Sequence, residues 1–446
     1  MSERRRILEK FEANKEFLEQ RIAQGIEKNR KGDCRLTVTD ARGNPVSNAR
    51  VKVTQKSHAF RFGANLFMLD ELETPEKNEK YKTFFKELFN MATLPFYWNT
   101  IEPRKGYTRY KKGCEPIYRR PAIDLCMEFC EKNGIEPREH ALAYEHFFPD
   151  WLKAASVEEI KAAYEKRCVQ IAERYADKIP TIEVTNELYW PEGTTAIYDE
   201  PDFVDFSFKT ARKYFPHNQL CMNEGQTVGF GGRGCAQDHF YLQVERALLA
   251  GTPVDAIGLQ HHMFFQAEEE YEKTRIYYDP VRIYKLLDNY ARLEKPIQIT
   301  EITIPAYTDR PEDEQLQAEI LELLYSIWFS HEKVEQIVYW NLVDGYAHVW
   351  DPDPEVIRAS QGDMTLGENY YRGGLLRFDL SPKPAYLKLK ELINERWHTE
   401  TELTTDADGA VFFRGFYGTY DVEITAGGQT ITKTIRLTKK EKVFVL

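Results

Sequence analysis

Eight short segments of apolar and β-branched residues recur along the middle of the chain. They begin roughly 30 to 48 residues apart, which leaves room for one helix between successive strands. Most of the gaps carry a helical pattern, as at 156–165 and 314–323. Eight such units predict an α/β fold with a (β/α)8 TIM barrel. The predicted strands are 62–65, 91–96, 140–143, 181–185, 219–222, 256–259, 297–300 and 337–340.

Both ends of the chain alternate apolar and polar residues around turn signals, a pattern typical of short strands. Residues 33–57 predict two strands and the last 48 residues predict four. Because two strands alone are only marginally stable, we expect both ends to build one small β-sandwich. Residues 38–53 and 405–422 also resemble the two halves of a carboxypeptidase-regulatory-like β-sandwich. The predicted domains are an amphipathic helix (1–32), the first part of the sandwich (33–57), the barrel (58–398) and the second part of the sandwich (399–446).

The composition of the chain disfavours nucleic-acid binding and membrane spanning. The formal net charge of -11 disfavours nucleic acid as a partner, because phosphate binding needs a concentrated basic face. No apolar run approaches the about 20 residues that a membrane span requires. Seven scattered cysteines and an N-terminus without an apolar leader predict a cytoplasmic protein, or a secreted one if the sequence has been trimmed. The oligomeric state is left open.

Two glutamates follow predicted strands of the barrel. Glu187 follows the fourth strand and Glu301 follows the seventh. Active sites of such barrels lie at the carboxyl ends of the strands, and strands three steps apart face each other there. A pair of carboxylates can cleave a glycosidic bond. A separation of about 5 to 5.5 Å allows double displacement, whereas about 6.5 to 9.5 Å fits inversion. The sequence leaves that choice open.

Several motifs around these glutamates resemble glycoside hydrolase family 10, whose members are mainly endo-β-1,4-xylanases with a (β/α)8 barrel and a retaining mechanism. The resemblance covers about residues 58 to 397. The matching motifs are Asn186-Glu187, Thr300-Glu301, Gly258 to His262, Val338 to Trp340, His140 to Trp151, Trp98 with Glu102-Pro103, and Lys383 to Tyr386.

The resemblance implies roles for the residues of these motifs. Glu187 would be the general acid/base, Glu301 the nucleophile, Asn186 a contact to the sugar 2-hydroxyl, and His262 a partner that helps to keep Glu301 ionised. Substrate contacts are also expected of Gln260, Trp340, His140, Tyr144, Glu145 and Trp98. Position at or beyond a strand end adds Asn223, for which a structural role is an equal alternative, and the stacking candidate Trp190.

The chain also departs from the family pattern. Leu-Pro-Phe-Tyr-Trp at 94–98 stands where the family has Asn-Glu-Met-Lys-Trp, Tyr144-Glu145 replaces Trp-His, and Thr303 stands where many members have Asp. We expect Pro95, Phe96 and Tyr97 to leave an apolar stacking surface. The mechanism should therefore be kept, while the substrate changes to a different glycone or to a glycoside with an apolar aglycone.

These observations predict a xylanase-like retaining β-glycoside hydrolase that acts on an oligosaccharide or a small β-glycoside. No metal or other cofactor is expected, because no His-Glu-x-x-His or phosphate-binding motif is present. The alternative is a non-catalytic carbohydrate-binding protein on a degenerate barrel, which the presence of both glutamates disfavours. Endo or exo action stays open.

Overall fold

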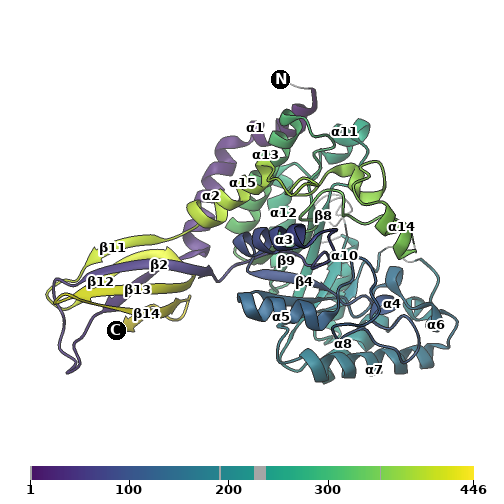
Figure 1. Cartoon of the computed structure of the whole chain (residues 1–446), viewed down its shortest axis with the longest axis horizontal. Coiled ribbons are helices and arrows are strands. Elements are labelled where there is room, and N and C mark those ends of the chain that lie inside the picture. The colour runs from purple at the N-terminus through teal and green to yellow at the C-terminus, as the bar shows by residue number, and fades with distance from the viewer. Residues whose placement is uncertain (1–2, 190–191, 226–237, 352) are drawn as a thin grey trace.

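A closed barrel of eight parallel strands forms the centre of the molecule (Figure 1). The computed structural model describes residues 3–189, 192–225, 238–351 and 353–446. The strands follow chain order around the barrel, and the last pairs with the first, so the predicted TIM barrel is confirmed. They are β3 (Arg61–Asn65), β4 (Met91–Pro95), β5 (Glu136–His140), β6 (Thr181–Asn186), β7 (Gln219–Glu224), β8 (Ala256–His262), β9 (Ile297–Thr303) and β10 (Val334–Tyr339).

The third barrel strand differs from its predicted position. Strand β5 ends at His140, whereas the apolar segment 140–143 was expected to form it. The strand escapes apolar pattern recognition because Arg138, Glu139 and His140 are charged or polar and yet fully buried. Arg138 and His140 both pair with Glu183 of β6 inside the barrel, which offsets the cost of burying them.

Helices surround the barrel and begin at local signals in the sequence. Ser156 and Glu159 form a capping box at the start of α7, and Thr74 caps α3. Gly134 ends α5 in the left-handed conformation, which glycine adopts at little cost. The helices are α3 (Pro75–Leu88), α4 (Trp98–Ile101), α5 (Ile123–Asn133), α6 (Asp150–Lys153), α7 (Val157–Tyr175), α8 (Phe203–Tyr214), α10 (His239–Leu249), α11 (Glu270–Thr274), α12 (Pro280–Ala291), α13 (Pro311–Ser330), α14 (Pro354–Ala359) and α15 (Pro384–Glu391). Among the described helices, none combines the length and the apolar character that a membrane crossing needs.

The N-terminal segment packs on the outside of the barrel. It comprises a 3-10 turn (Glu3–Leu8), α1 (Glu9–Ala13) and α2 (Lys15–Asn29), and α2 lies beside α13 (Figure 1). Arg4 pairs with Glu270 and Asp313 at 2.7 and 3.0 Å. Gly25 of α2 contacts the Ser330 backbone so closely that a side chain there would overlap it.

Both chain ends build a β-sandwich beside the barrel, as predicted (Figure 1). One sheet has the order β12-β1-β15 and the other β11-β2-β13-β14. Alternate residues such as Leu36, Val51, Val53 and Val422 fill a separate apolar core between the sheets. The domain ranges 1–32, 33–57, 58–398 and 399–446 stay a prediction. The strands are β1 (Lys31–Thr37), β2 (Arg50–His58), β11 (Glu400–Thr404), β12 (Ala410–Phe416), β13 (Gly418–Ala426), β14 (Gln429–Leu437) and β15 (Val443–Val445).

Aromatic rings join the sandwich to the barrel. Trp397, just before β11, stacks on Phe329 of α13 with ring centroids 4.2 Å apart and on Phe62 of β3 at 5.8 Å. Phe416 of the sandwich packs against the same Phe329 at 6.0 Å. The junction is therefore an extension of the barrel core, in which Trp397 is buried.

We expect Trp397→Ala to lower the free energy of unfolding by about 3–5 kcal/mol, the usual cost of removing a large buried aromatic side chain. The thermal unfolding midpoint measures this effect. Phe412→Ala is the control, because Phe412 lies on the same sandwich but is 63% exposed. Its effect should stay within about 0.5 kcal/mol. Equal losses in the two variants would contradict a junction stabilised by Trp397.

Candidate active site

A cavity of about 360 Å³ opens at the carboxyl ends of the barrel strands. It contains eight of the predicted site residues, drawn from several strands. Its walls are formed by Phe67, Tyr97, Arg119, Arg120, His140, Tyr144, His146, Phe147, Asn186, Glu187, Gly225, Gln260, His262, Phe264, Glu301, Trp340, His348, Trp350 and Glu368.

Glu187 and Glu301 share one hydrogen-bond donor. Gln260 Nε2 lies 2.8 Å from Glu187 Oε1 and 2.8 Å from Glu301 Oε1. Twice that distance, 5.6 Å, is the largest separation that these two carboxylate oxygens can have. Gln260 and Glu301 are register partners at a bulge between β8 and β9, and bulges redirect side chains near active sites. Glu187 has a φ of 53°, a left-handed conformation that is rare outside glycine.

Glu301 is buried among hydrogen-bond donors. Besides Gln260, Asn223 Nδ2 and His262 Nε2 each lie 3.2 Å from its carboxylate. Burial raises the pKa of Glu301 well above its ordinary value, with a further increase from Glu187, while His140 acts in the opposite direction. The hydrogen bonds favour the ionised form that a nucleophile needs.

His262 supports Glu301 as a neutral imidazole. Burial lowers the pKa of His262 to about 4, so at neutral pH the ring carries one proton. We assign that proton to Nε2, because the carboxylate of Glu301 can only accept. Nδ1 then accepts a hydrogen bond from Thr303 Oγ1 at 2.9 Å. The Thr that replaces the family Asp therefore fixes the tautomer without adding a second negative charge.

Glu187 receives a hydrogen bond from a residue that departs from the family pattern. Tyr144 Oη donates to Glu187 Oε2 at 2.6 Å, where a tryptophan in the same position has no hydroxyl to offer. Together with Gln260, Tyr144 holds the carboxyl group in one orientation.

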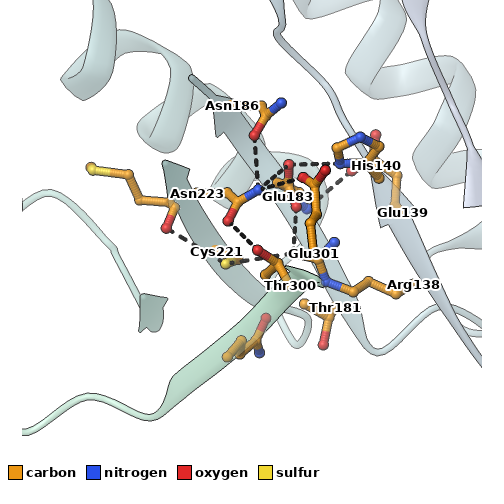
Figure 2. Close-up of polar contacts among 12 residues, drawn as sticks. Arg138, Glu139, His140, Thr181, Glu183, Asn186, Cys221, Asn223, Thr300 and Glu301 are labelled. Carbon is orange, nitrogen blue, oxygen red and sulfur yellow. Dashed lines mark hydrogen bonds and ion pairs between the residues drawn. The ribbon is translucent and has the colours of Figure 1, made fainter. Parts of the chain in front are cut away.

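A buried polar network surrounds Glu301 (Figure 2). Asn223 Nδ2 contacts Asn186 Oδ1 at 2.8 Å and Glu183 Oε1 at 3.2 Å, in addition to Glu301. Thr300 Oγ1 donates to Asn223 Oδ1 at 2.6 Å and so fixes which end of the amide faces the carboxylates. The network connects β6, β7 and β9 and holds the Glu301 carboxylate in place.

One group of side chains in the described part of the chain has the spacing of metal ligands. Donor atoms of His140, Glu183 and Glu301 lie within 4.8 Å of one another. Glu183 already forms an ion pair with Arg138 and a 2.8 Å contact with His140 Nδ1, so a cation bound there would have to displace Arg138. Glu183 is thus already paired with Arg138 and His140, and we assign no metal to this group.

Three predicted substrate-binding residues do not line this cavity, and their contact with substrate stays a prediction. Asn223 is buried beneath it, and Trp98 packs against Phe148 on the outer side of the barrel. The Glu145 carboxylate accepts hydrogen bonds from the backbone N–H groups of the segment after β6, including Thr195 at 3.1 Å. Trp190, the remaining stacking candidate, lies outside the described residues.

The expected apolar surface from residues 95–97 is smaller than predicted. Only Tyr97 lines the cavity, whereas Phe96 points outward against Tyr175. Alternation along an extended segment explains this, because neighbouring side chains point to opposite faces.

Loop residues that the strand-end argument missed complete the walls. The adjacent pair Arg119-Arg120 was the one visible signal. The missed residues are Phe67, Arg119, Arg120, His146, Phe147, Gly225, Phe264, His348 and Glu368.

The fold and the paired glutamates define a barrel of the glycosidase type, and comparison with known families agrees. The model of Glycosyl hydrolase family 10 matches residues 55–390. The chain therefore belongs to glycosyl hydrolase family 10.

Curated relatives are similar over most of this chain. Anti-sigma-I factor RsgI6 of Acetivibrio thermocellus is 26% identical over 404 residues, which cover 90% of this chain and 46% of that protein. Endo-1,4-beta-xylanase 2 of Arabidopsis thaliana is 24% identical over 409 residues, covering 89% of this chain and 32% of that protein. The chain thus spans less than half the length of these relatives.

Solved structures share the fold. Xylanase 10B from Thermotoga petrophila, in complex with xylobiose, superposes with a TM-score of 0.58 at 20% identity, covering 76% of this chain and 95% of that one. Native xylanase 10B from Thermotoga maritima gives a TM-score of 0.57 at 20% identity, with 76% and 96% covered.

We expect Asn223→Ala to move the acidic limb of the pH profile of kcat/KM to higher pH. Losing the Nδ2 donor destabilises the carboxylate of Glu301, so its pKa rises further and the ionised form is reached only at higher pH. The maximal kcat/KM should fall about 10- to 150-fold, the value of a hydrogen bond to a charged group.

Thr93→Val is the control for this variant. Its hydroxyl is buried on β4, a barrel strand that pairs with neither β7 nor β9, and makes no hydrogen bond with a described residue. The limb should not move in Thr93→Val. An unchanged limb in Asn223→Ala would show that Asn223 does not control the ionisation of Glu301.

Proposed function

We propose that this protein is a retaining β-glycoside hydrolase, xylanase-like in mechanism, that acts on an oligosaccharide or a small β-glycoside. Membership of the family and similarity to named xylanases support the reaction class. The observation that carries the proposal is the shared contact of Glu187 and Glu301 with Gln260 Nε2. This contact brings two carboxyl groups, from barrel strands three steps apart, within reach of one glycosidic bond.

The distance between the two glutamates supports double displacement over inversion. Their Oε1 atoms lie no more than 5.6 Å apart. Retaining enzymes place the two carboxyl groups about 5 to 5.5 Å apart, whereas inverting enzymes need about 6.5 to 9.5 Å to admit a water molecule.

Two steps then complete the reaction. In the first, a Glu301 carboxylate oxygen bonds to the anomeric carbon, the glycosidic C–O bond breaks, and Glu187 gives its proton to the leaving oxygen. In the second, Glu187 takes a proton from water while the water oxygen attacks the anomeric carbon. The bond to Glu301 breaks, and the sugar leaves with its original anomeric configuration.

Other cavity residues have free groups for the sugar. Asn186 Oδ1 accepts from Asn223 and Gln260, while its Nδ2 is buried without a partner among the described residues. We assign this N–H to the sugar 2-hydroxyl. Trp340 lies at the carboxyl end of β10 and would be the platform under the sugar ring.

The proposal includes a cytoplasmic location. The six cysteines in the described part of the chain have no disulfide partner, and five of them are buried. This usage is typical of a reducing compartment. Cell fractionation of the native protein checks the location.

Replacing Glu301 should strongly lower turnover of both nitrophenyl β-glycosides and xylo-oligosaccharides, whereas replacing Glu187 should do so most clearly for xylo-oligosaccharides. Glu187→Gln should lower kcat by about 10²- to 10⁴-fold on substrates whose leaving group needs protonation. Glu301→Gln should lower it at least as much on every substrate, because it removes the nucleophile. NMR of the wild-type reaction should show the β-anomer as the first product.

Glu224→Gln is a matched control for both variants. Glu224 also ends a strand, does not line the cavity, and burial raises its pKa to about 8, so glutamine resembles its protonated form. Turnover should persist in this control. First appearance of the α-anomer would refute double displacement, and glycan binding without turnover in the wild type would favour the carbohydrate-binding alternative.

A further inference from the structure

One wall of the cavity contains two adjacent buried arginines. Arg119 and Arg120 lie between α4 and α5 and are 2% and 6% exposed. Both line the cavity, and neither forms an ion pair with any carboxylate in the described ranges. A buried charge is costly unless it is paired, so this arrangement calls for a partner that enters from the cavity.

Most donors of Arg120 have no hydrogen-bond partner among the residues that the structure describes. Its guanidinium lies over the rings of Tyr97, Phe67 and Phe147, at 4.4, 5.2 and 5.2 Å from their centroids. Of its five N–H donors, only Nη1 makes a hydrogen bond with a described residue, donating to the Arg119 carbonyl at 2.9 Å. Burial lowers the pKa of Arg120 to about 10, which still leaves it charged at neutral pH.

Arg109 shows what a purely structural arginine looks like in the same segment. It is equally buried but does not line the cavity. Its guanidinium donates to three backbone carbonyls, those of Glu115, Thr100 and Arg120, at 2.6, 2.8 and 3.0 Å. Arg120 lacks such a set of carbonyl partners, so scaffolding alone does not account for it.

His348 on the same wall also lacks partners. Neither of its ring nitrogens makes a hydrogen bond within the described part of the chain, and the same holds for Nε of Arg119. Burial, Arg119 and Arg120 lower the pKa of His348 well below its ordinary value, so the ring is neutral. A neutral imidazole offers one donor and one acceptor to a polar ligand.

The charges on this wall fit a monoanion. The charged residues that line this wall are Arg119, Arg120 and Glu368, whose carboxylate accepts from Asn341 Nδ2 at 2.9 Å, so their formal sum is one positive charge. A planar carboxylate matches the guanidinium fork with two parallel hydrogen bonds. A dianionic phosphate would exceed the available charge.

We propose that Arg120, with Arg119 and His348, binds the carboxylate of a uronic acid residue in the substrate, beside the bond that Glu187 and Glu301 cleave. The substrate class is therefore an acidic β-glycoside. This inference rests on the proposed hydrolase function and specifies its substrate.

Two matched substrate pairs test the proposal. Nitrophenyl β-glucuronide and β-glucoside differ at the C6 carboxylate and place it on the cleaved sugar. Uronic-acid-substituted xylo-oligosaccharides and their carboxyl-reduced forms place it on a branch. We expect kcat/KM to favour the acid at least 10-fold in one pair, and the pair that responds identifies the position of the carboxylate. No preference for the acid in either pair overturns the proposal.

Arg120→Met should lower the preference for the acid about 10- to 150-fold, since it removes hydrogen bonds to a charged group. Arg120→Lys keeps the positive charge but loses the forked guanidinium, so it should lose part of the preference for the acidic substrate. If Arg120→Met does not fold, Arg120→Lys is the variant that tests the proposal. Arg104→Met is the control. Arg104 is in the same segment, exposed, and paired with Glu115 at 2.8 Å, so its loss should leave the preference unchanged.

Calorimetry separates this inference from the proposed function. Glu301→Gln, with and without Arg120→Met, is titrated with the acidic and the carboxyl-reduced oligosaccharides and with both nitrophenyl glycosides. If the wild type cleaves nothing, the hydrolase proposal fails, but tighter binding of an acidic ligand that depends on Arg120 still supports the uronate subsite. Equal binding of the acidic and neutral members of both pairs overturns the subsite, whatever the turnover.

Discussion

The hydrogen bonds from the Gln260 amide to Glu187 and Glu301 set the geometry on which the rest of the site depends. One nitrogen atom with two short contacts limits the distance between carboxylates that come from strands on different sides of the barrel. Two anionic groups at such a distance repel each other, and a shared donor reduces that cost. The contact thus both positions and stabilises the pair.

A second amide at the site, that of Asn223, depends on close packing between strands. Gly258 of β8 faces Asn223 of β7 so closely that a Cβ at residue 258 would overlap the Asn223 side-chain oxygen. Asn223 can therefore lie between the strands and reach Glu301, while Thr300 orients its amide. Glycine is needed here for space rather than for an unusual backbone conformation.

Sequence patterns predicted the barrel, the sandwich and the pairing of Glu187 with Glu301 because each leaves a local signal. Apolar runs located seven barrel strands, and a carboxylate at a strand end indicated the site. The pattern failed at β5, whose interior side chains Arg138 and His140 are polar because they pair with Glu183 across the barrel. For Asn223 the sequence left a substrate contact and a structural role open, since a strand-end residue under the cavity has the same sequence signal as one inside it.

The cavity walls were harder to predict, because loop residues reach them through tertiary contacts. Tyr97 occupies the position of a family lysine, so the local sequence indicates that positive charge is lost. In the folded protein Arg120, which lies in the following loop, places its guanidinium 4.4 Å from the Tyr97 ring centroid and restores a cation at that wall. Thr303 meanwhile places a neutral hydroxyl next to His262, whose pKa burial lowers to about 4. The hydrogen bonds of the two glutamates stay in place beside both changes. The strands thus preserve the paired glutamates, while a loop supplies the cation at the cavity wall.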